Sequence, residues 1–344
     1  MIHNRAWVLA RRPEGAVAIT DFALRTEPFA PPKLDEGEIL VGTRVFSCAP
    51  TIRNWLNPPA ASYRAAIAIG DPIRGMAACE VLASRHAGFA EGELITAVAP
   101  WQDFAVLKPD QAAVPLTIIP CDLDLIDAMT LHSPNSLTAY FGLYAVGMAS
   151  AGETVLVSGA AGSVGAMVCQ LAKHSGCRVV GVAGGPGKCD WLVRECGVDA
   201  AIDYRQGNLD AQVKAAFPGG INLFFDNVGG EILQRAVDHM APHGRIVLCG
   251  QISAYDTGRP APGPADMMKL VYGRLRMEGF VVGDFADRYD EAHTEIAQLA
   301  EAGKVAVRVD VRDGFECLPT AFVDLFAGAN TGTLIVRNDT CGAD

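Results

Sequence analysis

Short apolar runs recur through residues 150–285, and most stretches between them have the apolar spacing of helices. The run at residues 154–157 (TVLV) is uniformly apolar and β-branched, which is typical of a strand buried on both faces of a parallel sheet. Strands are expected at residues 153–158, 178–183, 199–203, 222–226, 245–249 and 277–282. Six strands joined by helical crossovers predict an α/β fold with a doubly wound parallel sheet.

Residues 1–127 have a different pattern, in which short alternating runs are separated by proline-rich turns. Strands are expected there at residues 6–10, 37–46, 76–83 and 94–98. The prolines favour loops over helices, so this part is predicted to be a mostly β domain. Residues 127–148 are predicted to be mainly helical and to lead into the doubly wound part.

Three glycines, Gly159, Gly162 and Gly165, follow the strand at 154–157 and precede a helix-like segment and a second strand. In such a unit the first glycine allows a tight turn and the second lets backbone N–H groups approach a pyrophosphate. The third lets helix and strand pack closely, and the helix N-terminus adds a partial positive charge. Glycines also cluster in ordinary turns, but the spacing and both flanks together favour a dinucleotide site.

The end of the second strand distinguishes between the two nicotinamide cofactors. An NAD site usually carries Asp or Glu about 20 residues after the glycines, to bind the ribose 2′-hydroxyl. Here the strand ends in the segment 182–188 (VAGGPGK), which has no carboxylate. Gly184 leaves room for a 2′-phosphate and Lys188 can neutralise it. Alone, Lys188 is equally well explained as a solvated loop lysine; with the missing acid it favours NADP(H).

The last part of the chain is expected to return to the first domain. A helix at residues 288–303 precedes a last helix from residue 322, a turn at 330–332 and a final strand. We therefore predict a catalytic, substrate-binding domain of residues 1–127 and 290–344, and a dinucleotide-binding Rossmann domain of residues 128–289.

Composition excludes several classes of partner and site. The formal net charge is −11 and no Lys/Arg-rich run is present, which argues against nucleic acid and anionic membrane surfaces. The apolar runs are too short to span a bilayer, and the N-terminus lacks the apolar core of a signal peptide, so a cytoplasmic protein is expected. Ten cysteines without a CxxC pair and seven histidines without metal spacing predict that no metal is bound.

Several segments together resemble the medium-chain dehydrogenase/reductase superfamily. The matching segments are residues 4–10 (NRAWVLA), 12–15 (RPEG), 70–75 (GDPIRG), 137–142 (LTAYFG), 160–165 (AAGSVG), 225–230 (FDNVGG), 249–255 (CGQISAY) and 328–332 (GANTG). The closer similarity is to its zinc-free double-bond reductases, which include prostaglandin reductases, plant alkenal reductases and bacterial curcumin reductase. The resemblance implies a GroES-like fold for the mostly β domain and an NADPH-dependent enzyme. Zinc-dependent members carry a Gly-His-Glu segment, whereas residues 74–80 (RGMAACE) contain no histidine.

The resemblance also implies which residues contact the cofactor. Gly162 to Gly165 would hold the pyrophosphate, Lys188 and Tyr204 would flank the 2′-phosphate, and the ends of later strands would lie beside the rest. The expected contacts are Gly162, Ser163, Val164, Gly165, Gly184, Lys188, Tyr204, Asn227, Cys249, Gly250, Ile252, Ser253, Tyr255, Phe280, Val281, Val282 and Asn330. For the strand ends, loop geometry is the alternative, since Asn227 before Val-Gly-Gly can simply shape a turn.

Tyr255 is the candidate catalytic residue, because a phenol beside a developing enolate can donate a hydrogen bond and a proton. An aromatic side chain that only packs on the ligand explains it equally well. Related enzymes often carry Asp-Pro-Tyr-Met-Arg where this chain has the segment 49–53 (APTIR). The usual tyrosine is therefore absent, with Ile52 expected in its place, and the shape of the substrate pocket stays open.

The leading hypothesis is an NADPH-dependent reductase of the C=C bond of an α,β-unsaturated ketone or aldehyde. Reduction of quinones is a second hypothesis, because zinc-free relatives also do that. A non-catalytic NADPH-binding sensor or structural protein is a third. Related enzymes are commonly homodimers joined through their nucleotide domains, and the apolar edge near Val247, Leu248 and residues 277–282 leads us to expect the same here. The physiological substrate, the stereochemistry of addition and the proton donor are left open.

Overall fold

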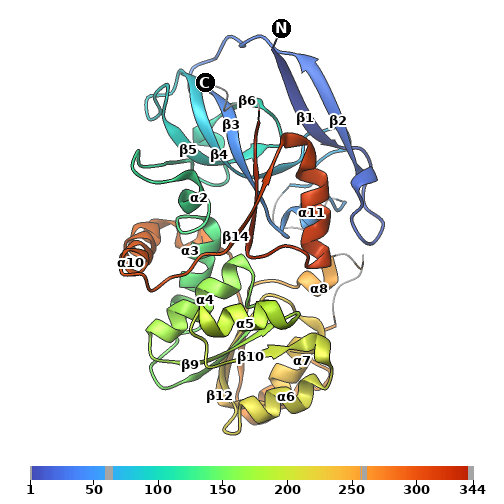
Figure 1. Cartoon of the computed structure of the whole chain (residues 1–344), viewed down its shortest axis with the longest axis vertical. Helices are drawn as coiled ribbons and strands as arrows, with labels where there is room; N and C mark the ends of the chain where they lie inside the picture. The colour runs from blue at the N-terminus through green and yellow to red at the C-terminus, as the bar shows by residue number, and fades with distance from the viewer. Residues whose placement is uncertain (1, 59–64, 256, 258–261, 340–344) are drawn as a thin grey trace. The chain divides into compact units, whose positions relative to one another are not determined.

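The computed structural model describes residues 2–58, 65–255, 257 and 262–339, and the chain divides into two compact units. The first unit consists of Met1–Met129 and Val309–Asp344, and the second unit consists of Thr130–Arg308. Elements of both are labelled in Figure 1.

A six-stranded parallel sheet forms the centre of the second unit. Its strands are β8 (Thr154–Ser158), β9 (Arg178–Ala183), β10 (Ala200–Asp203), β11 (Ile221–Asp226), β12 (Met240–Leu248) and β13 (Arg276–Gly279). Their order across the sheet is β10-β9-β8-β11-β12-β13, and all neighbouring strands are parallel. The chain runs outward from β8 to β10 and then returns to β11 beside β8, so the expected doubly wound fold is confirmed.

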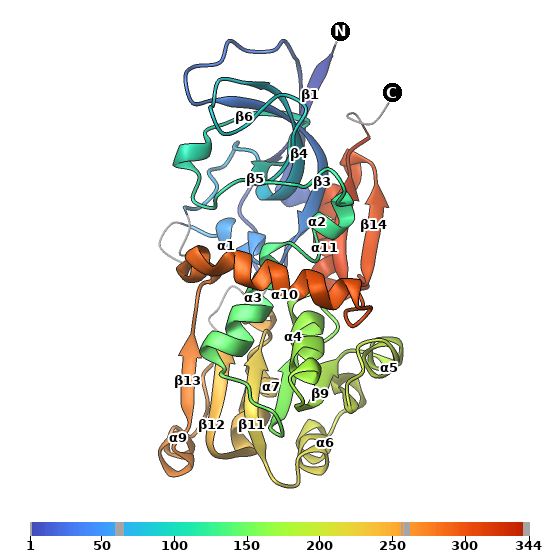
Figure 2. The same ribbon diagram turned by 90° about the vertical axis from the view of Figure 1, so that its left-hand side faces the viewer.

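Helices cover both faces of this sheet. The helices of this unit, of which α8 lies at the end of the sheet, are α3 (Pro134–Phe141), α4 (Ser163–His174), α5 (Pro186–Arg194), α6 (Leu209–Ala216), α7 (Gly230–Asp238), α8 (Ile252–Tyr255), α9 (Met268–Gly273) and α10 (Tyr289–Glu301). Val155 and Val157 lie in one core with residues of α3, α4 and α10, which Figure 2 shows in front of the strands. Leu156 lies in a second core with residues of α6 and α7. A strand covered on both faces is apolar at every position, as residues 155–157 are.

The helix α10 belongs to the second unit, whereas the sequence placed residues 290–308 with the first. Its buried apolar face lies in the core shared with α3 and α4 and consists of Ala292, Ile296 and Leu299. The Tyr140 hydroxyl of α3 also hydrogen-bonds to Glu291 at 3.1 Å and to Glu295 at 2.9 Å. The boundary therefore falls after Arg308.

The first unit is mostly β, as expected. Its strands are β1 (His3–Leu9), β2 (Phe22–Pro28), β3 (Ile39–Cys48), β4 (Arg74–Ser84), β5 (Leu94–Pro100), β6 (Phe104–Leu107), β7 (Thr117–Ile118), β14 (Val309–Asp313) and β15 (Thr333–Arg337). Its helices are α1 (Ile52–Trp55), α2 (Leu125–Ala128) and α11 (Leu318–Ala327). The larger sheet has the order β14-β15-β3-β4-β5-β7, with β6 also paired to β3. The antiparallel pairing of β15 with β3 joins the C-terminal segment to this unit, and β14 was not expected from the sequence.

Two expected elements are shorter or more broken than predicted. The helical stretch at 127–148 divides into α2, α3 and a π-helical turn, Gly142–Val146, in which the Gly147 N–H donates to the Gly142 carbonyl at 2.8 Å. A β-carbon at Gly142 would lie 2.6 Å from ring atoms of Phe225 and Phe280, so only glycine allows this close packing. The strand expected at 277–282 ends at Gly279, and Phe280 to Val282 follow it.

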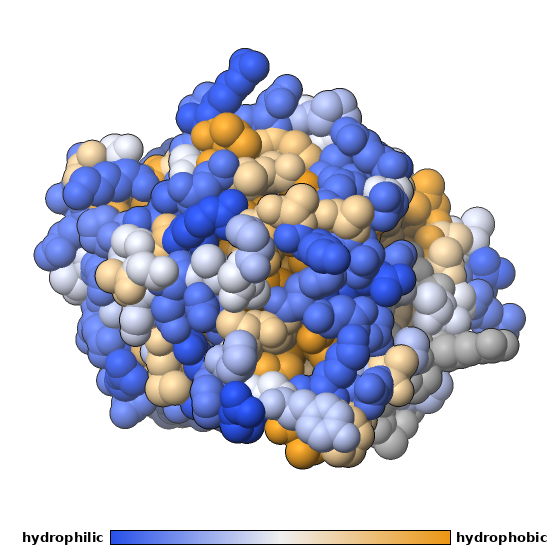
Figure 3. Space-filling view, turned by 90° about the horizontal axis from the view of Figure 1, so that it is seen from below, coloured by the Kyte–Doolittle hydropathy of each residue, from blue (hydrophilic) through white to orange (hydrophobic). Residues whose placement is uncertain are grey.

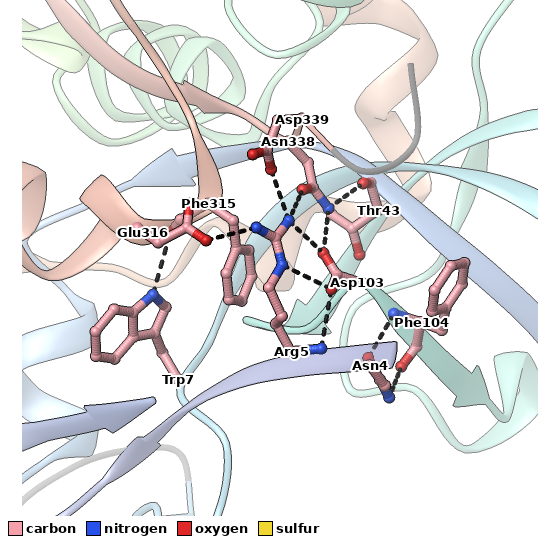
Figure 4. A network of polar contacts seen from close by, with 10 residues as sticks. All are labelled: Asn4, Arg5, Trp7, Thr43, Asp103, Phe104, Phe315, Glu316, Asn338 and Asp339. Carbon is pink, nitrogen blue, oxygen red and sulfur yellow. Dashed lines mark hydrogen bonds and ion pairs between the residues drawn. The ribbon is translucent and has the colours of Figure 1, made fainter. Parts of the chain in front are cut away.

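A cluster of polar residues, which we call the Arg5 cluster, joins distant parts of the first unit (Figure 4). The Arg5 guanidinium donates to Asp103, Glu316, Asn338 and Asp339. Asp103 is fully buried, and Asn338 donates both to Asp103 and to the Thr43 carbonyl. The cluster therefore ties β1 to the C-terminal end of the described chain through charge-assisted hydrogen bonds.

The surface seen from below Figure 1 is mostly hydrophilic, with apolar side chains scattered between polar ones (Figure 3). Among the described residues, no helix combines the length and the apolar character needed to cross a bilayer.

Candidate nucleotide and substrate site

The three glycines form the expected tight connection between β8 and α4. Gly159 has a φ of +58° and Gly162 is the N-cap of α4. The Ala160 N–H donates to the Val182 carbonyl of β9 at 3.0 Å, which closes the turn against the sheet. A β-carbon at Gly165 would lie 2.3 Å from the Gly159 carbonyl oxygen, so any side chain there would collide with the turn. The backbone of the turn at Gly159 therefore lies directly against the start of α4. The N-terminal N–H groups of α4 lie at the carboxyl edge of the sheet.

The ends of β9 and β10 form a second part of this edge. A β-carbon at Gly184 would lie 2.8 Å from the Tyr204 hydroxyl and 3.0 Å from Nε of Arg205. Gly184 therefore lets the side chains of Tyr204 and Arg205 lie directly against the end of β9. The two predicted residues Gly184 and Tyr204 are thus brought together.

A carboxylate does lie at this place, contributed by β10 rather than by β9. Asp203 is paired in register with Ala183, and its Oδ1 accepts from the N–H groups of Gly185 at 2.8 Å and Arg205 at 3.0 Å. The Gly185 hydrogen bond is the main cause that lowers the pKa of Asp203. By accepting these two backbone N–H groups, the Asp203 carboxylate fixes the turns that follow β9 and β10.

Three cations gather beside this turn. Burial is the main cause that lowers the pKa of Lys188, and the positive charges of Arg205 and Arg308 lower it further. The Arg205 guanidinium lies 5.9 Å from the centre of the Tyr204 ring, and that of Arg308 lies 5.8 Å from the Trp191 ring. Like charges held close together disfavour one another until an anion binds between them. The sequence pattern predicts Lys188 but neither arginine, and the one signal for them is that Arg205 follows Tyr204 in the chain.

The ends of β8, β11 and β12 meet at the third part of the edge. Ser158 Oγ donates to Asp226 at 2.7 Å, and the main-chain oxygen of Asp226 accepts from the N–H groups of Cys249 and Gly250. Burial is the main cause that raises the pKa of the Cys249 thiol to about 12, and the nearby Asp226 adds to it. The side-chain amide of Asn227 donates to the Ser158 carbonyl at 2.7 Å, so it shapes the turn in the way that the alternative explanation expected.

The helix α8 brings Tyr255 to the end of β12. The N–H groups of Ile252 and Ser253 donate to the carbonyls of Asn227 and Val228, which attaches α8 to the end of β11. A β-carbon at Gly250 would lie 3.2 Å from the Tyr255 hydroxyl oxygen. The hydroxyl therefore lies over the backbone at the same carboxyl edge as the glycine turn.

The remaining predicted contacts differ in their surroundings. Phe280 and Val282 pack against the core that contains α3 and α4, whereas Val281 is exposed. Asn330 lies in the first unit, where it is buried and its side-chain amide donates to the Gly332 carbonyl at 2.8 Å. Contact of these residues with a cofactor stays a prediction.

Ile52 is not an open wall of a pocket. It is fully buried, and a β-carbon at Gly75 would lie 3.0 Å from its Cδ1. Its neighbour Thr51, which occupies the place of the tyrosine when the five-residue segments are matched letter by letter, is partly exposed. The expectation that Ile52 replaces the tyrosine is wrong, because Thr51 and not Ile52 is the third residue of the segment; Ile52 itself is a core residue of the first unit.

Comparisons with known proteins cover nearly the whole chain. Residues 5–114 match a family described as the N-terminal domain of oxidoreductase, and residues 163–299 match one described as zinc-binding dehydrogenase. The chain is 33% identical to the NADPH-dependent curcumin reductase of Escherichia coli, with 97% of this chain and 96% of the relative covered. It is 36% identical to the NADP-dependent 2-alkenal reductase of Nicotiana tabacum, with 88% and 89% covered. The crystal structure of CurA from Vibrio vulnificus in complex with NADPH matches with a TM-score of 0.90 at 33% identity, covering 98% of this chain and 99% of that one.

The zinc in one family description has no fitting ligand set here. Within the part of the chain that the structure describes, no group of three or more His, Cys, Asp and Glu residues is placed to hold a metal ion.

Proposed function

We propose, on the premise that the chain belongs to the NADP-dependent medium-chain dehydrogenase/reductase family, that it reduces the C=C bond of α,β-unsaturated ketones or aldehydes. NADPH, when bound, supplies a hydride to the β-carbon of the substrate. The names of the relatives support a double-bond reductase, and the residues at the carboxyl edge of the second unit support the roles that follow.

The residues at the first two parts of the edge fit the phosphates of NADPH. The N–H groups of Ser163, Val164 and Gly165 lie in the first turn of α4, where they have no partner within the helix and can bind the pyrophosphate. The space beside Gly184 is filled by the side chains of Tyr204 and Arg205, so the 2′-phosphate is proposed to bind to Lys188 and Arg205 at the end of β9 rather than over Gly184 itself. A phosphate bound there would relieve the mutual repulsion of the cations, which favours NADPH over NADH.

Tyr255 is proposed to donate a hydrogen bond to the substrate oxygen as negative charge develops on it. The hydroxyl stabilises the enolate more than the neutral carbonyl, because the interaction strengthens with the charge on the acceptor. Tyr255 or water then protonates the α-carbon. The observation that carries this proposal is the position of the Tyr255 hydroxyl over Gly250, at the same sheet edge as the glycine turn and the cations.

A homodimer and a cytoplasmic location complete the proposal. Val247 is fully buried in an interior strand, so it does not form the apolar edge that was expected. The two edge strands of the sheet are β10 and β13, and near β13 the helix α9 exposes Val271 and Tyr272 by 60% and 71%. Exposed apolar residues beside a strand with one unpaired side support pairing of two second units. The cytoplasmic location rests on the sequence alone.

The reaction is tested by incubating the protein with NADPH and a panel of enones, enals and quinones. Loss of NADPH with formation of the saturated carbonyl compound supports the proposal. Turnover of quinones alone would favour the second hypothesis. Tight NADPH binding without turnover across the panel would favour the non-catalytic one.

A further inference from the structure

Asp226, the last residue of β11, accepts several hydrogen bonds at the end of the sheet. Its Oδ1 accepts from Ser158 Oγ at 2.7 Å, from the Val228 N–H at 3.0 Å and from the Gly229 N–H at 2.9 Å. Its main-chain oxygen accepts from Cys249 at 2.8 Å and from Gly250 at 3.1 Å. One buried residue thus connects the ends of β8, β11 and β12.

Hydrogen bonds continue from Asp226 to the helix that carries Tyr255. Asp226 Oδ1 accepts from the Val228 N–H, which shares a peptide group with the Asn227 carbonyl, and from the Gly229 N–H, which shares one with the Val228 carbonyl. Ser158 Oγ donates to the same Oδ1 and accepts from the Asn227 N–H at 2.8 Å. The carbonyls of Asn227 and Val228 in turn accept from the N–H groups that begin α8. The two peptide groups that support α8 are therefore both fixed from the Asp226–Ser158 pair.

A carboxyl group at this position is unfavourable for the fold by itself. Asp226 is fully buried, and burial is the main cause that raises its pKa, against the lowering effect of its hydrogen bonds. Its Oδ2 makes no hydrogen bond to any part of the chain that the structure describes. A buried polar atom without a partner in the chain costs free energy, so a carboxyl group at this position calls for an explanation.

We propose that Asp226 is a positioning residue that fixes α8, and with it the Tyr255 hydroxyl, at the carboxyl edge of the sheet. The inference rests on the proposed function of Tyr255. Asp226 itself touches neither substrate nor hydride. It orients the Asn227–Val228 backbone, that backbone orients α8, and α8 orients the phenol.

A double-mutant cycle tests whether Asp226 acts through Tyr255. Asp226→Ala is expected to lower kcat for an enone, measured at saturating NADPH, about tenfold, because the phenol is no longer held at the edge of the sheet. In a Tyr255→Phe background the same substitution should lower kcat by less than about twofold. Asp226→Asn keeps an oxygen in the Oδ1 position and should retain kcat within about threefold. Independent effects, in which the double variant shows the product of the two single losses, would overturn the proposal.

Hydrogen exchange of the unliganded protein tests the same inference without turnover. Asp226→Ala should speed exchange of the amides of Ile252 and Ser253, which donate to the backbone that Asp226 holds. Asp103→Asn changes an equally buried carboxylate in the first unit and should leave these amides unaffected. Unchanged exchange at Ile252 and Ser253 in Asp226→Ala would refute the positioning role. If exchange is faster in the variant but the unmutated protein turns over no enone, the positioning role is supported and the proposed function is refuted. If Asp226→Ala does not fold, Ser158→Ala takes its place. This variant loses the hydrogen bond from Ser158 Oγ to Asp226 and the one from the Asn227 N–H to Ser158 Oγ. The same measurements of kcat and of hydrogen exchange then test the positioning role.

Discussion

Replacing Lys188 with alanine should weaken NADPH binding and leave NADH binding nearly unchanged. A hydrogen bond to a charged group contributes about 1.5–3 kcal/mol, which corresponds to about 10- to 150-fold in Kd. Lys188 shares its surroundings with Arg205 and Arg308, whose charges lower its pKa and would remain after the substitution. We therefore expect the lower part of that range, about 10- to 30-fold for NADPH. NADH lacks the 2′-phosphate, so its Kd should change less than about twofold.

Fluorescence titration of both cofactors measures this difference directly. Lys214→Ala is the matched control, because Lys214 is an exposed lysine on α6 and its loss changes the net charge by the same amount. The control separates a local contact from the general effect of protein charge. Equal losses for Lys188→Ala and Lys214→Ala, or equal affinity of the unmutated protein for NADPH and NADH, would refute the assignment of the phosphate site.

Four further predictions concern chemistry, metal, assembly and stability. Tyr255→Phe should lower kcat for enones by up to about 100-fold with little change in NADPH binding, and less if water replaces the hydroxyl; an unchanged rate, with hydride transfer shown by a deuteride isotope effect to be limiting, would make Tyr255 only a packing residue. Activity should survive exhaustive chelation, and metal analysis should find no stoichiometric zinc; activity lost to a chelator and restored by zinc would reveal a missed site. Light scattering should give the mass of a dimer at micromolar concentration, and a monomer mass would contradict the proposed pairing. Arg5→Ala should destabilise the first unit by about 3 kcal/mol in denaturant unfolding, because it leaves the buried Asp103 carboxylate without its cation; a loss below about 1 kcal/mol would show that the Arg5 cluster is not stabilising.

The parts of the fold that follow from local pattern were predictable. The strand–glycine–helix unit from Thr154 to His174 has its signals within one short stretch. The other strands of the six-stranded sheet are likewise short apolar runs, separated by segments that mostly have helical spacing. The partner of α10 could not be found in this way. An apolar helix face shows that the helix packs on another element, but it does not identify that element. The strand β14 was missed for a related reason: its residues Val309–Asp313 alternate with charged side chains and gain their place by pairing with β15.

The candidate site was predictable only where one segment carries it. The glycine spacing led to Gly162, and the strand end without a carboxylate led to Lys188. The resemblance to double-bond reductases, which the comparisons confirm, led to Tyr255. Arg308 stands 120 positions after Lys188 in the sequence, and only the tertiary fold makes their charges interact. Likewise Asp226 was overlooked in favour of Asn227, because nothing local shows that its carboxyl group is buried and holds the neighbouring backbone.

Deuterium transfer from NADPH, labelled at the hydride that is transferred, is the most direct test of hydride addition to the β-carbon of an enone. The protein is incubated with labelled NADPH and an α,β-unsaturated ketone, and the product is analysed by mass spectrometry and NMR. Reduction of the C=C bond gives a saturated ketone that carries one deuterium at the β-carbon, with the α-carbon protonated from solvent. Deuterium at the hydroxyl-bearing carbon of an allylic alcohol, formed by reduction of the C=O bond, would contradict this reaction, as would no transfer to any enone or enal.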